Sequence, residues 1–144
     1  MHTIRTAVVL AAGFGTRRLP ITKAIEKSML PIGNRPLIDY LVADLAAAGI
    51  ERIIFVVGEQ SNQLRTYYGH NEKLEKYLSE RGQAQLLEEV QGTNRGIQYE
   101  YVVQPMDGKY GSAVPLSLAL PLVRDEPGYI VTSGDDFTWG GWSE

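Results

Sequence analysis

The sequence predicts an α/β fold with a mainly parallel β-sheet. Short apolar runs, typical of strands buried on both faces, alternate along the chain with segments whose apolar residues have helical spacing. No internal repeat or low-complexity segment interrupts this alternation. Strands that alternate with helices form parallel sheets with helices on their faces. We therefore expect one α/β unit over residues 1–144.

The apolar runs place four strands. Two adjacent valines, Val8 and Val9, lie within the first run, and Gly13 follows it. Each later run is likewise followed by glycine or a polar residue, which is how a buried strand ends. The expected strands are Thr6 to Ala12, Ile53 to Val57, Ile97 to Val103 and Tyr129 to Thr132.

The segments between the strands predict helices. The first helix opens at Pro36, because proline is tolerated at the first helical position, and it ends at Gly49. The charged segment from Glu72 to Gln91 predicts two helical pieces separated at Gly82 and packed on one side of the molecule. A short helix is expected from Ser112 to Leu120.

The composition excludes several classes of function. The chain has 14 Lys and Arg against 17 Asp and Glu, a net charge of −3, which gives no overall attraction to nucleic acid or membranes. It has no cysteine, which excludes disulfides, thiolate catalysis and cysteine zinc sites. No apolar stretch approaches the roughly 18 residues of a membrane-spanning helix. We expect a cytoplasmic protein without nucleic-acid or membrane partners.

Polar clusters follow the first, third and fourth expected strands. Because ligands of open parallel sheets bind beyond the carboxyl ends of the strands, these clusters should converge on one crevice. The long polar loop from Gly13 to Pro31 contains the first cluster. There Gly13 and Gly15 let backbone N–H groups approach phosphate oxygens, and Arg17 adds a fork of charged donors. Taken alone, this motif fits a plain tight turn equally well.

The remaining candidates also have ordinary interpretations when each is taken alone. Lys23 and Lys27 lie in the same loop and could clamp a phosphate, but solvated loop charges are the usual fate of lysine. Gln104, after the third strand, would most often be a surface side chain. Asp135 and Asp136, after the fourth strand, are good turn formers. The functional hypothesis rests on all clusters occurring in order after alternating strands.

The stretch from Ala7 to Tyr40 resembles the sugar-phosphate nucleotidyltransferases, most closely the bacterial UTP–glucose-1-phosphate uridylyltransferases. The resemblance is carried by the Gly-x-Gly-Thr-Arg loop, the Thr-Lys-Ala-Ile segment and Lys-x-Met-Leu-Pro at this spacing. It continues through the charged segment to Asp135. It implies a Rossmann-like three-layer sandwich. Complete relatives are about twice as long, so we expect residues 1–144 to be the N-terminal, nucleotide-binding part of a truncated nucleotidyltransferase fold, with the C-terminal sugar-binding half absent.

The resemblance implies how the nucleotide is held. In this family a glutamine after the third strand reads the edge of the base and a glycine lies close to the base; these match Gln104 and Gly111. An amide offers a donor and an acceptor together, as the edge of a pyrimidine requires. The glycine-rich turn wraps the base and triphosphate, and it corresponds here to Ala11, Ala12, Gly13, Gly15 and Thr16.

The resemblance also implies the catalytic residues. Arg17 matches the arginine that contacts the triphosphate and favours departure of pyrophosphate. Lys27, rather than Lys23, matches the lysine that binds phosphates of the reacting pair, and Asp135 matches the aspartate that holds Mg²⁺. The implied reaction transfers UMP from UTP to a sugar 1-phosphate, with glucose 1-phosphate as the expected acceptor. The alternatives are a non-catalytic nucleotide-binding module and a relative that uses dTTP or CTP.

The sequence departs from the family signature at three positions. Glu26 stands where proline usually precedes the lysine, Ser28 stands where an acid is common, and Lys109 replaces an expected glycine. Glu26 either weakens the positive field at Lys27 or points away from it. A sheet that ended at the fourth strand would have an exposed edge, which favours association of copies into a homo-oligomer.

Overall fold

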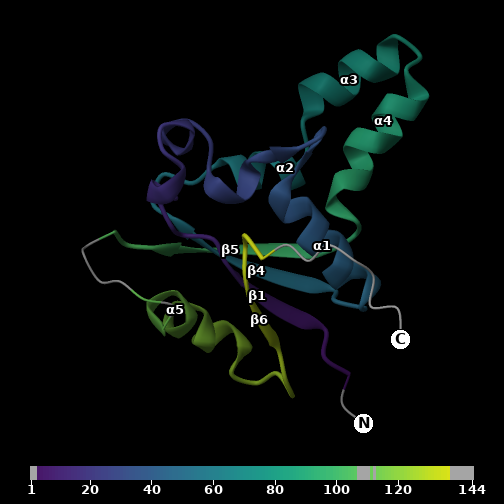
Figure 1. Cartoon of the computed structure of the whole chain (residues 1–144). Helices are drawn as coiled ribbons and strands as arrows, with labels where there is room; N and C mark the ends of the chain where they lie inside the picture. Colours follow the sequence, from purple (N-terminus) through teal and green to yellow (C-terminus); the bar gives the residue numbers. More distant parts are fainter. Residues whose placement is uncertain (1–2, 107–110, 112, 137–144) are drawn as a thin grey trace, which may run out of the picture.

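A parallel four-stranded sheet forms the centre of the molecule in the computed structural model, which describes residues 3–106, 111 and 113–136 (Figure 1). The strands are β1 (Thr6–Leu10), β4 (Arg52–Gly58), β5 (Gln98–Gln104) and β6 (Ile130–Ser133), in the order β5-β4-β1-β6. All three strand pairs are parallel. The predicted parallel sheet is therefore confirmed.

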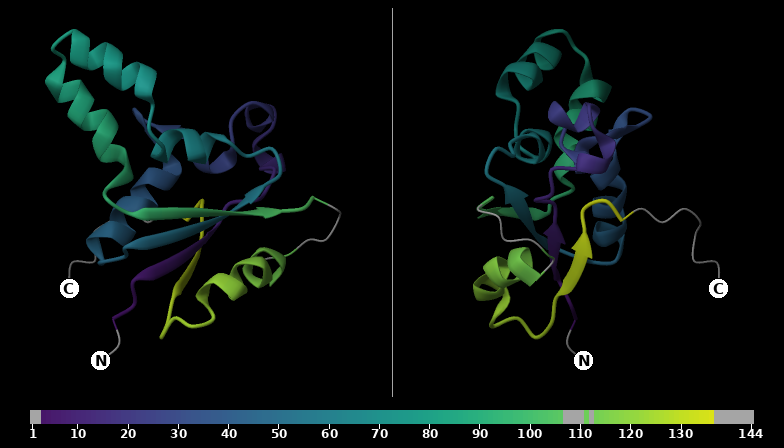
Figure 2. Two further views of the ribbon diagram at one scale, coloured as in Figure 1. Left: turned by 180° about the vertical axis from the view of Figure 1, so that it is seen from behind. Right: turned by 60° about the vertical axis from the view of Figure 1, so that its left-hand side comes forward.

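Helices cover both faces of this sheet. Figure 2 shows α5 on one face, with α1 and α2 on the other. The helices are α1 (Leu37–Ala47), α2 (Gln63–Tyr68), α3 (Glu72–Glu80), α4 (Ala84–Gln91) and α5 (Ala113–Val123). A short antiparallel hairpin, β2 (Pro31–Ile32) and β3 (Arg35–Pro36), precedes α1. Within the part of the chain that the structure describes, no helix has the length and apolar character needed to cross a bilayer.

Each face of the sheet has its own hydrophobic core, as a three-layer sandwich requires. Alternate residues of β1 point to opposite sides: Val9 joins the core beneath α1 and α2, and Val8 joins the core beneath α5. Leu64 of α2 and Val123 of α5 are buried in these two cores. The predicted Rossmann-like sandwich is therefore confirmed, and the continuous apolar runs are explained by burial on both faces.

The order of the strands places a crevice beside β1. The chain passes from β1 to β4 and then to β5 in one direction across the sheet, and β6 pairs with the opposite side of β1. The strand order reverses between β1 and β6. Ligands of such sheets bind outside the carboxyl ends of the strands at this point of reversal.

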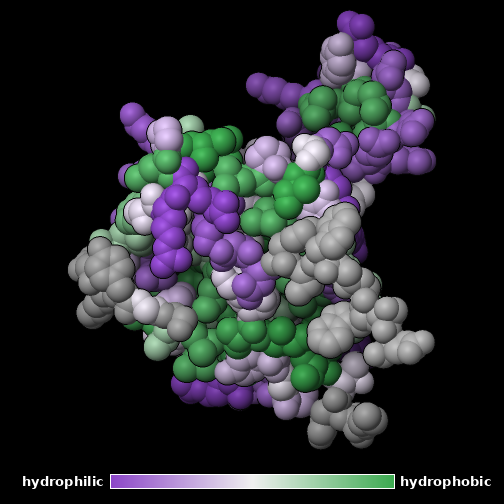
Figure 3. Space-filling view, in the orientation of Figure 1, coloured by the Kyte–Doolittle hydropathy of each residue, from purple (hydrophilic) through white to green (hydrophobic). Residues whose placement is uncertain are grey.

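The helices α3 and α4 project from the rest of the molecule as a hairpin (Figure 1). They pack against each other, and Gly82 between them has a φ of +66°, which explains the predicted interruption. The surface of the hairpin is mostly hydrophilic around a small apolar patch (Figure 3). The two helical pieces and the charged surface agree with the prediction, but the hairpin projects from the molecule instead of packing along one side of it.

Four local elements differ from the sequence prediction. The expected plain loop from Gly13 to Pro31 contains three 3-10 turns, η1 (Thr16–Arg18), η2 (Ile21–Lys23) and η3 (Lys27–Met29). The helix α2 and the hairpin β2–β3 were not expected at all, because both are too short to show a periodic pattern. The helix α5 continues to Val123 with Pro121 inside it, and Ser112, its expected first residue, lies outside the described residues.

A buried carboxylate connects α1 to the chain around it. The side chain of Asp39 is buried, and both of its oxygens accept hydrogen bonds from Arg95, at 2.6 and 2.9 Å. Arg35 donates to the same carboxylate at 2.9 Å, and Tyr68 donates at 3.3 Å. Burial acts to raise the pKa of Asp39, but the hydrogen bonds and charges of Arg95 and Arg35 outweigh it and lower the pKa below its usual value of 3.8.

The lowered pKa of Asp39 predicts a loss of stability in acid. Because its pKa is lower in the folded chain than in the unfolded chain, the stabilisation is complete above pH 3.8 and is lost as the pH falls through the folded-state pKa. The free energy of unfolding, measured by urea denaturation at a series of pH values, should fall below about pH 4. An Asp39→Asn variant should show a smaller fall. The exposed Asp44 lies on the same helix, so an Asp44→Asn variant should behave as the unchanged chain.

Candidate functional site

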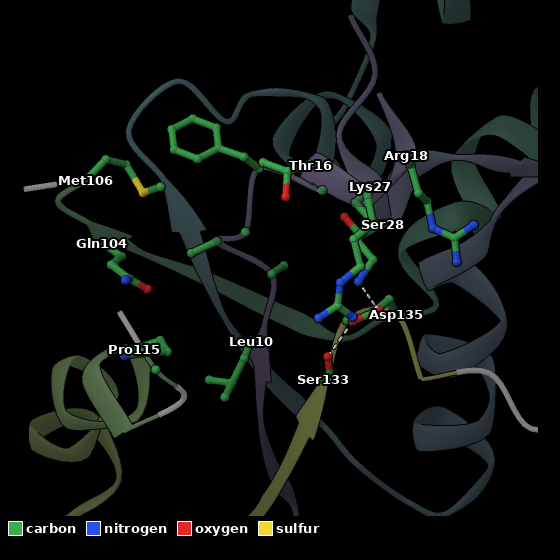
Figure 4. Close-up of a pocket in the computed structure, with 18 residues that line it drawn as sticks. Leu10, Thr16, Arg18, Lys27, Ser28, Gln104, Met106, Pro115, Ser133 and Asp135 are labelled. Carbon is green, nitrogen blue, oxygen red and sulfur yellow. Dashed lines mark hydrogen bonds and ion pairs between the residues drawn. The ribbon is translucent and has the colours of Figure 1, made fainter. Parts of the chain in front are cut away.

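A pocket of about 870 Å³ opens at the carboxyl ends of the parallel strands (Figure 4). Residues that follow β1, β5 and β6 line it together, so the polar clusters do converge on one crevice. All of the residues that the sequence proposed as a site line this pocket: Ala11, Ala12, Gly13, Gly15, Thr16, Arg17, Lys27, Gln104, Gly111 and Asp135. Lys23 is exposed on η2 and does not line it.

The glycine-rich turn brings β1 into close contact with the loop that carries Lys27. Gly15 has a φ of +63°, which favours glycine, and a Cβ atom there would lie 3.0 Å from both Cβ of Lys27 and Cγ2 of Thr22. The hydroxyl of Thr22 donates to the carbonyl of Gly15 at 2.9 Å. A Cβ on Gly13, by contrast, would have no neighbour within 4 Å. The turn is therefore tight at Gly15 and open at Gly13, where a ligand can reach the backbone.

Lys27 and Asp135 form an ion pair at one end of the pocket. Each side chain is about one-third exposed, and Figure 4 shows them reaching toward each other from different loops. The hydroxyl of Ser133 donates to the other carboxylate oxygen of Asp135 at 2.5 Å. Burial acts to raise the pKa of Asp135, but the hydrogen bonds from Lys27 and Ser133 and the charge of Lys27 lower it. The carboxylate is thus held ionised.

The turn after β6 is fixed against the end of β1. The backbone N–H of Gly134 donates to the carbonyl of Leu10 at 2.8 Å. A Cβ on Gly134 would lie 3.2 Å from Cβ of Ala11 and 3.3 Å from that carbonyl oxygen, so glycine favours the close approach of these two segments. This contact sets Asp135 beside the start of the glycine-rich turn.

The opposite end of the pocket has a different chemistry. Gln104 is the last residue of β5 and is only 8% exposed, and its amide points into the pocket (Figure 4). In residues 3–106, 111 and 113–136, no partner forms a hydrogen bond with this amide. The side chains of Met106 and Pro115 flank it and add apolar surface. The pocket therefore combines an amide and apolar groups at one end with Arg18, Lys27 and Asp135 at the other (Figure 4), and Arg17 also lines it.

Ser28 also lines the pocket, and its hydroxyl has no hydrogen-bond partner among the described residues. It is 5% exposed, its Oγ atom is buried, and it follows Lys27 in η3. A buried hydroxyl that makes no hydrogen bond is not compensated for the water it loses on folding, so we expect Ser28 to destabilise the folded chain.

Alanine in place of Ser28 is expected to raise the free energy of unfolding by about 1 kcal/mol, since it removes the unpaired hydroxyl. Urea denaturation measures the change. Ser61→Ala is the matched control, because the Ser61 hydroxyl donates to Glu26 at 2.6 Å. That variant should lose about 1 kcal/mol. Equal losses at both serines would contradict the interpretation of Ser28.

Sequence reasoning missed several residues of the pocket. Met106 and Ser133 follow predicted strands, where position alone could have indicated them, and Leu10 ends the observed β1, two residues before the predicted end of that strand. Phe14 and Arg18 belong to the glycine-rich loop that the sequence singled out. Pro115 lies in the first turn of α5 and has no local signal. The Lys109 position lies outside the described residues.

The donor set at Asp135 suits a hard cation that also binds phosphate. No group of three or more His, Asp and Glu side chains with the geometry of a metal site occurs in the described ranges, so an all-protein cage is not found there. Mg²⁺ is usually held by one or two carboxylates together with substrate phosphates and water. One ionised carboxylate facing a pocket with three cationic side chains fits that arrangement.

Comparison with known proteins shows which family the chain is similar to. The nucleotidyl transferase family model matches residues 6–141. UTP–glucose-1-phosphate uridylyltransferase of Bacillus subtilis is 38% identical over 136 residues, which cover 94% of this chain and 46% of that protein. UTP–glucose-1-phosphate uridylyltransferase 2 of Staphylococcus saprophyticus is 40% identical over the same shares.

Solved structures agree as well. A UTP-bound UGPase from Acinetobacter baumannii matches with a TM-score of 0.84 and 32% identity, over 92% of this chain and 46% of that one. The chain therefore spans about half the length of the relatives that it matches.

Proposed function

Because the chain belongs to the nucleotidyl transferase family, we propose that its pocket binds UTP for transfer of UMP to a sugar 1-phosphate. The observation that carries this proposal is the division of the pocket into two ends. Gln104 with apolar neighbours offers a place for a pyrimidine, and Arg17 with Lys27 offers a place for the triphosphate. The open backbone at Gly13 also lines the pocket and would offer an N–H donor to the phosphates.

The reaction needs positioning and charge neutralisation more than a protein nucleophile. An oxygen of the sugar 1-phosphate attacks the α-phosphorus of UTP in line. The bond from that phosphorus to the oxygen of the β-phosphate breaks, and pyrophosphate leaves with the electron pair. Arg17 and Lys27 bear the charges that would stabilise the phosphate oxygens during this exchange.

A bound triphosphate would compete with Asp135 for Lys27. The ammonium group now pairs with the carboxylate, and a polyanion in the pocket would draw it away. Asp135 would then be free to hold Mg²⁺, with Ser133 keeping the carboxylate in place. When bound, the metal ion neutralises charge on the phosphates.

The relatives support two further parts of the proposal, namely which sugar phosphate accepts UMP and which part of the protein binds the nucleotide. Both curated relatives are named for glucose 1-phosphate, so we propose the same acceptor here. Because this chain spans about half of their length, we propose that residues 1–144 form the nucleotide-binding part.

Calorimetric titration of the chain with UTP and Mg²⁺ tests the proposal. Saturable binding that is at least about 10-fold tighter for UTP than for ATP is expected, because Gln104 pairs with a pyrimidine edge. Tighter binding of dTTP or CTP would replace the base assignment. A folded chain that binds no nucleotide would contradict the proposal. Release of pyrophosphate after addition of glucose 1-phosphate would exclude a purely non-catalytic nucleotide-binding module.

A further inference from the structure

Glu26, which stands directly before Lys27, is fully engaged by the start of α2. Its carboxylate oxygen Oε1 accepts hydrogen bonds from the backbone N–H groups of Asn62, at 3.0 Å, and Gln63, at 2.9 Å. The second oxygen, Oε2, accepts from the hydroxyl of Ser61 at 2.6 Å. These residues lie 35 to 37 positions further along the chain. The carboxylate therefore joins two segments that are distant in sequence.

This carboxylate replaces the missing cap of α2. Asn62 occupies the N-cap position, but its side chain makes no capping hydrogen bond. The first N–H groups of a helix have no partner within the helix, and a side-chain oxygen normally accepts from them. Glu26 does so from the neighbouring loop, and its negative charge also suits the positive end of the helix.

The connection is reciprocal. The side-chain oxygen of Gln63 accepts from the backbone N–H of Glu26 at 2.8 Å, and its amide nitrogen donates to the carbonyl of Ala24 at 3.0 Å. The helix that bears Gln63 is anchored in the core by Leu64 and Tyr68, which are 0% and 4% exposed. The loop segment before Lys27 is thereby fastened to the core of the molecule.

Lys27 is consequently held from two sides. Its Cβ atom packs against Gly15, and its neighbour Glu26 is tied to α2. The carbonyl of Glu26 also accepts from the N–H of Met29 at 2.8 Å, which forms the 3-10 turn that contains Lys27. This geometry orients the ammonium group toward Asp135 in the pocket.

We propose that Glu26 is a positioning residue that holds Lys27 in place for the phosphates of the nucleotide. The proposal rests on the proposed function of the pocket. Glu26 is not among the residues that line the pocket, and its carboxylate is directed to Ser61, Asn62 and Gln63. The sequence left open whether Glu26 weakens the positive field at Lys27 or points away from it. The structure shows that its carboxylate points away from the phosphate end of the pocket.

The test measures UTP affinity in two variants. Glu26→Ala removes the three side-chain hydrogen bonds and is expected to weaken UTP binding about 10-fold, the usual effect of losing a group that orients a ligand-binding residue. Glu26→Gln keeps an oxygen for the two N–H groups and an N–H₂ group for the Ser61 hydroxyl, so it should stay within about 2-fold of the unchanged chain. If UTP binding depended on the negative charge of Glu26 rather than on its hydrogen bonds, Glu26→Gln would weaken the binding as much as Glu26→Ala does, which would contradict the proposal.

A double-mutant cycle shows whether Glu26 acts through Lys27. In a Lys27→Ala background, Glu26→Ala should have almost no further effect on UTP affinity. An undiminished loss there would overturn the proposal. Glu51→Ala is the matched control, since Glu51 is an exposed carboxylate paired with Arg5 and absent from the pocket. It should leave the affinity unchanged.

Crystal structures of the nucleotide-free chain decide the proposal independently of UTP. In Glu26→Ala the Cα atom of Lys27 should move by about 1 Å or more relative to the sheet, whereas in Glu26→Gln it should not. An unmoved Lys27 in Glu26→Ala overturns the proposal, whatever the affinity. If Glu26→Ala does not fold, Gln63→Ala replaces it and should move Lys27 in the same way. A chain that binds no UTP would contradict the proposed function alone.

Discussion

Alanine in place of Lys27 is expected to weaken UTP binding on the order of 100-fold, because one charge-assisted contact to phosphate is worth about 1.5–3 kcal/mol. The substitution also leaves the carboxylate of Asp135 without its ion-pair partner at the phosphate end of the pocket. Calorimetric titration with UTP in the presence of Mg²⁺ measures the loss.

Lys23→Ala provides the matched control for this prediction. Lys23 lies in the same loop, but it is exposed and does not line the pocket. Its removal should change UTP affinity by less than about 2-fold, because a solvated charge outside the site contributes only screened attraction. Equal losses at Lys23 and Lys27 would show that the loop acts by its general charge, and the assignment of Lys27 would fail.

Asparagine in place of Asp135 is expected to abolish the effect of Mg²⁺ on UTP binding. With Mg²⁺ present, the affinity should fall by about 10- to 100-fold, because an amide is a much poorer ligand for a hard cation than a carboxylate. Without Mg²⁺ the affinity should not fall, since the substitution removes a negative charge and frees Lys27 for the phosphates. Titrations with and without the metal separate these two effects.

Asp136→Asn is the control for Asp135→Asn. The side chain of Asp136 accepts a hydrogen bond from the N–H of Ser133 at 3.3 Å and does not line the pocket. An asparagine oxygen can accept the same bond, so the response to Mg²⁺ should persist. Loss of that response in both variants would mean that the turn as a whole, rather than the Asp135 carboxylate, is required.

The sheet and the convergence of the site were predictable because both depend on local patterns. The four apolar runs coincide with the observed strands to within two residues at each end. Once the strands are parallel, their carboxyl ends share one edge, so Arg17, Gln104 and Asp135 must approach a common crevice. No knowledge of side-chain contacts was needed for that conclusion.

The features that the sequence did not predict depend on contacts between distant residues. The helix α2 has six residues, and its cap comes from Glu26, so neither periodicity nor a local capping signal indicated it. Asp39 and Arg95 lie 56 positions apart, and nothing in either segment pairs them. In the sequence, Glu26 is recognisable only as a departure from the family signature. Its hydrogen bonds to the start of α2 are visible only in the structure.

We propose above all that the pocket beside β1 is the binding site for UTP. Backbone amide NMR spectra of the labelled chain, recorded during a titration with UTP and Mg²⁺, test it most directly. We expect the largest shifts at Gly13, Gly15, Lys27, Gln104 and Asp135, all of which line the pocket. Saturable shifts confined to the α3–α4 hairpin or to the opposite end of the sheet, with these amides unmoved, would contradict it.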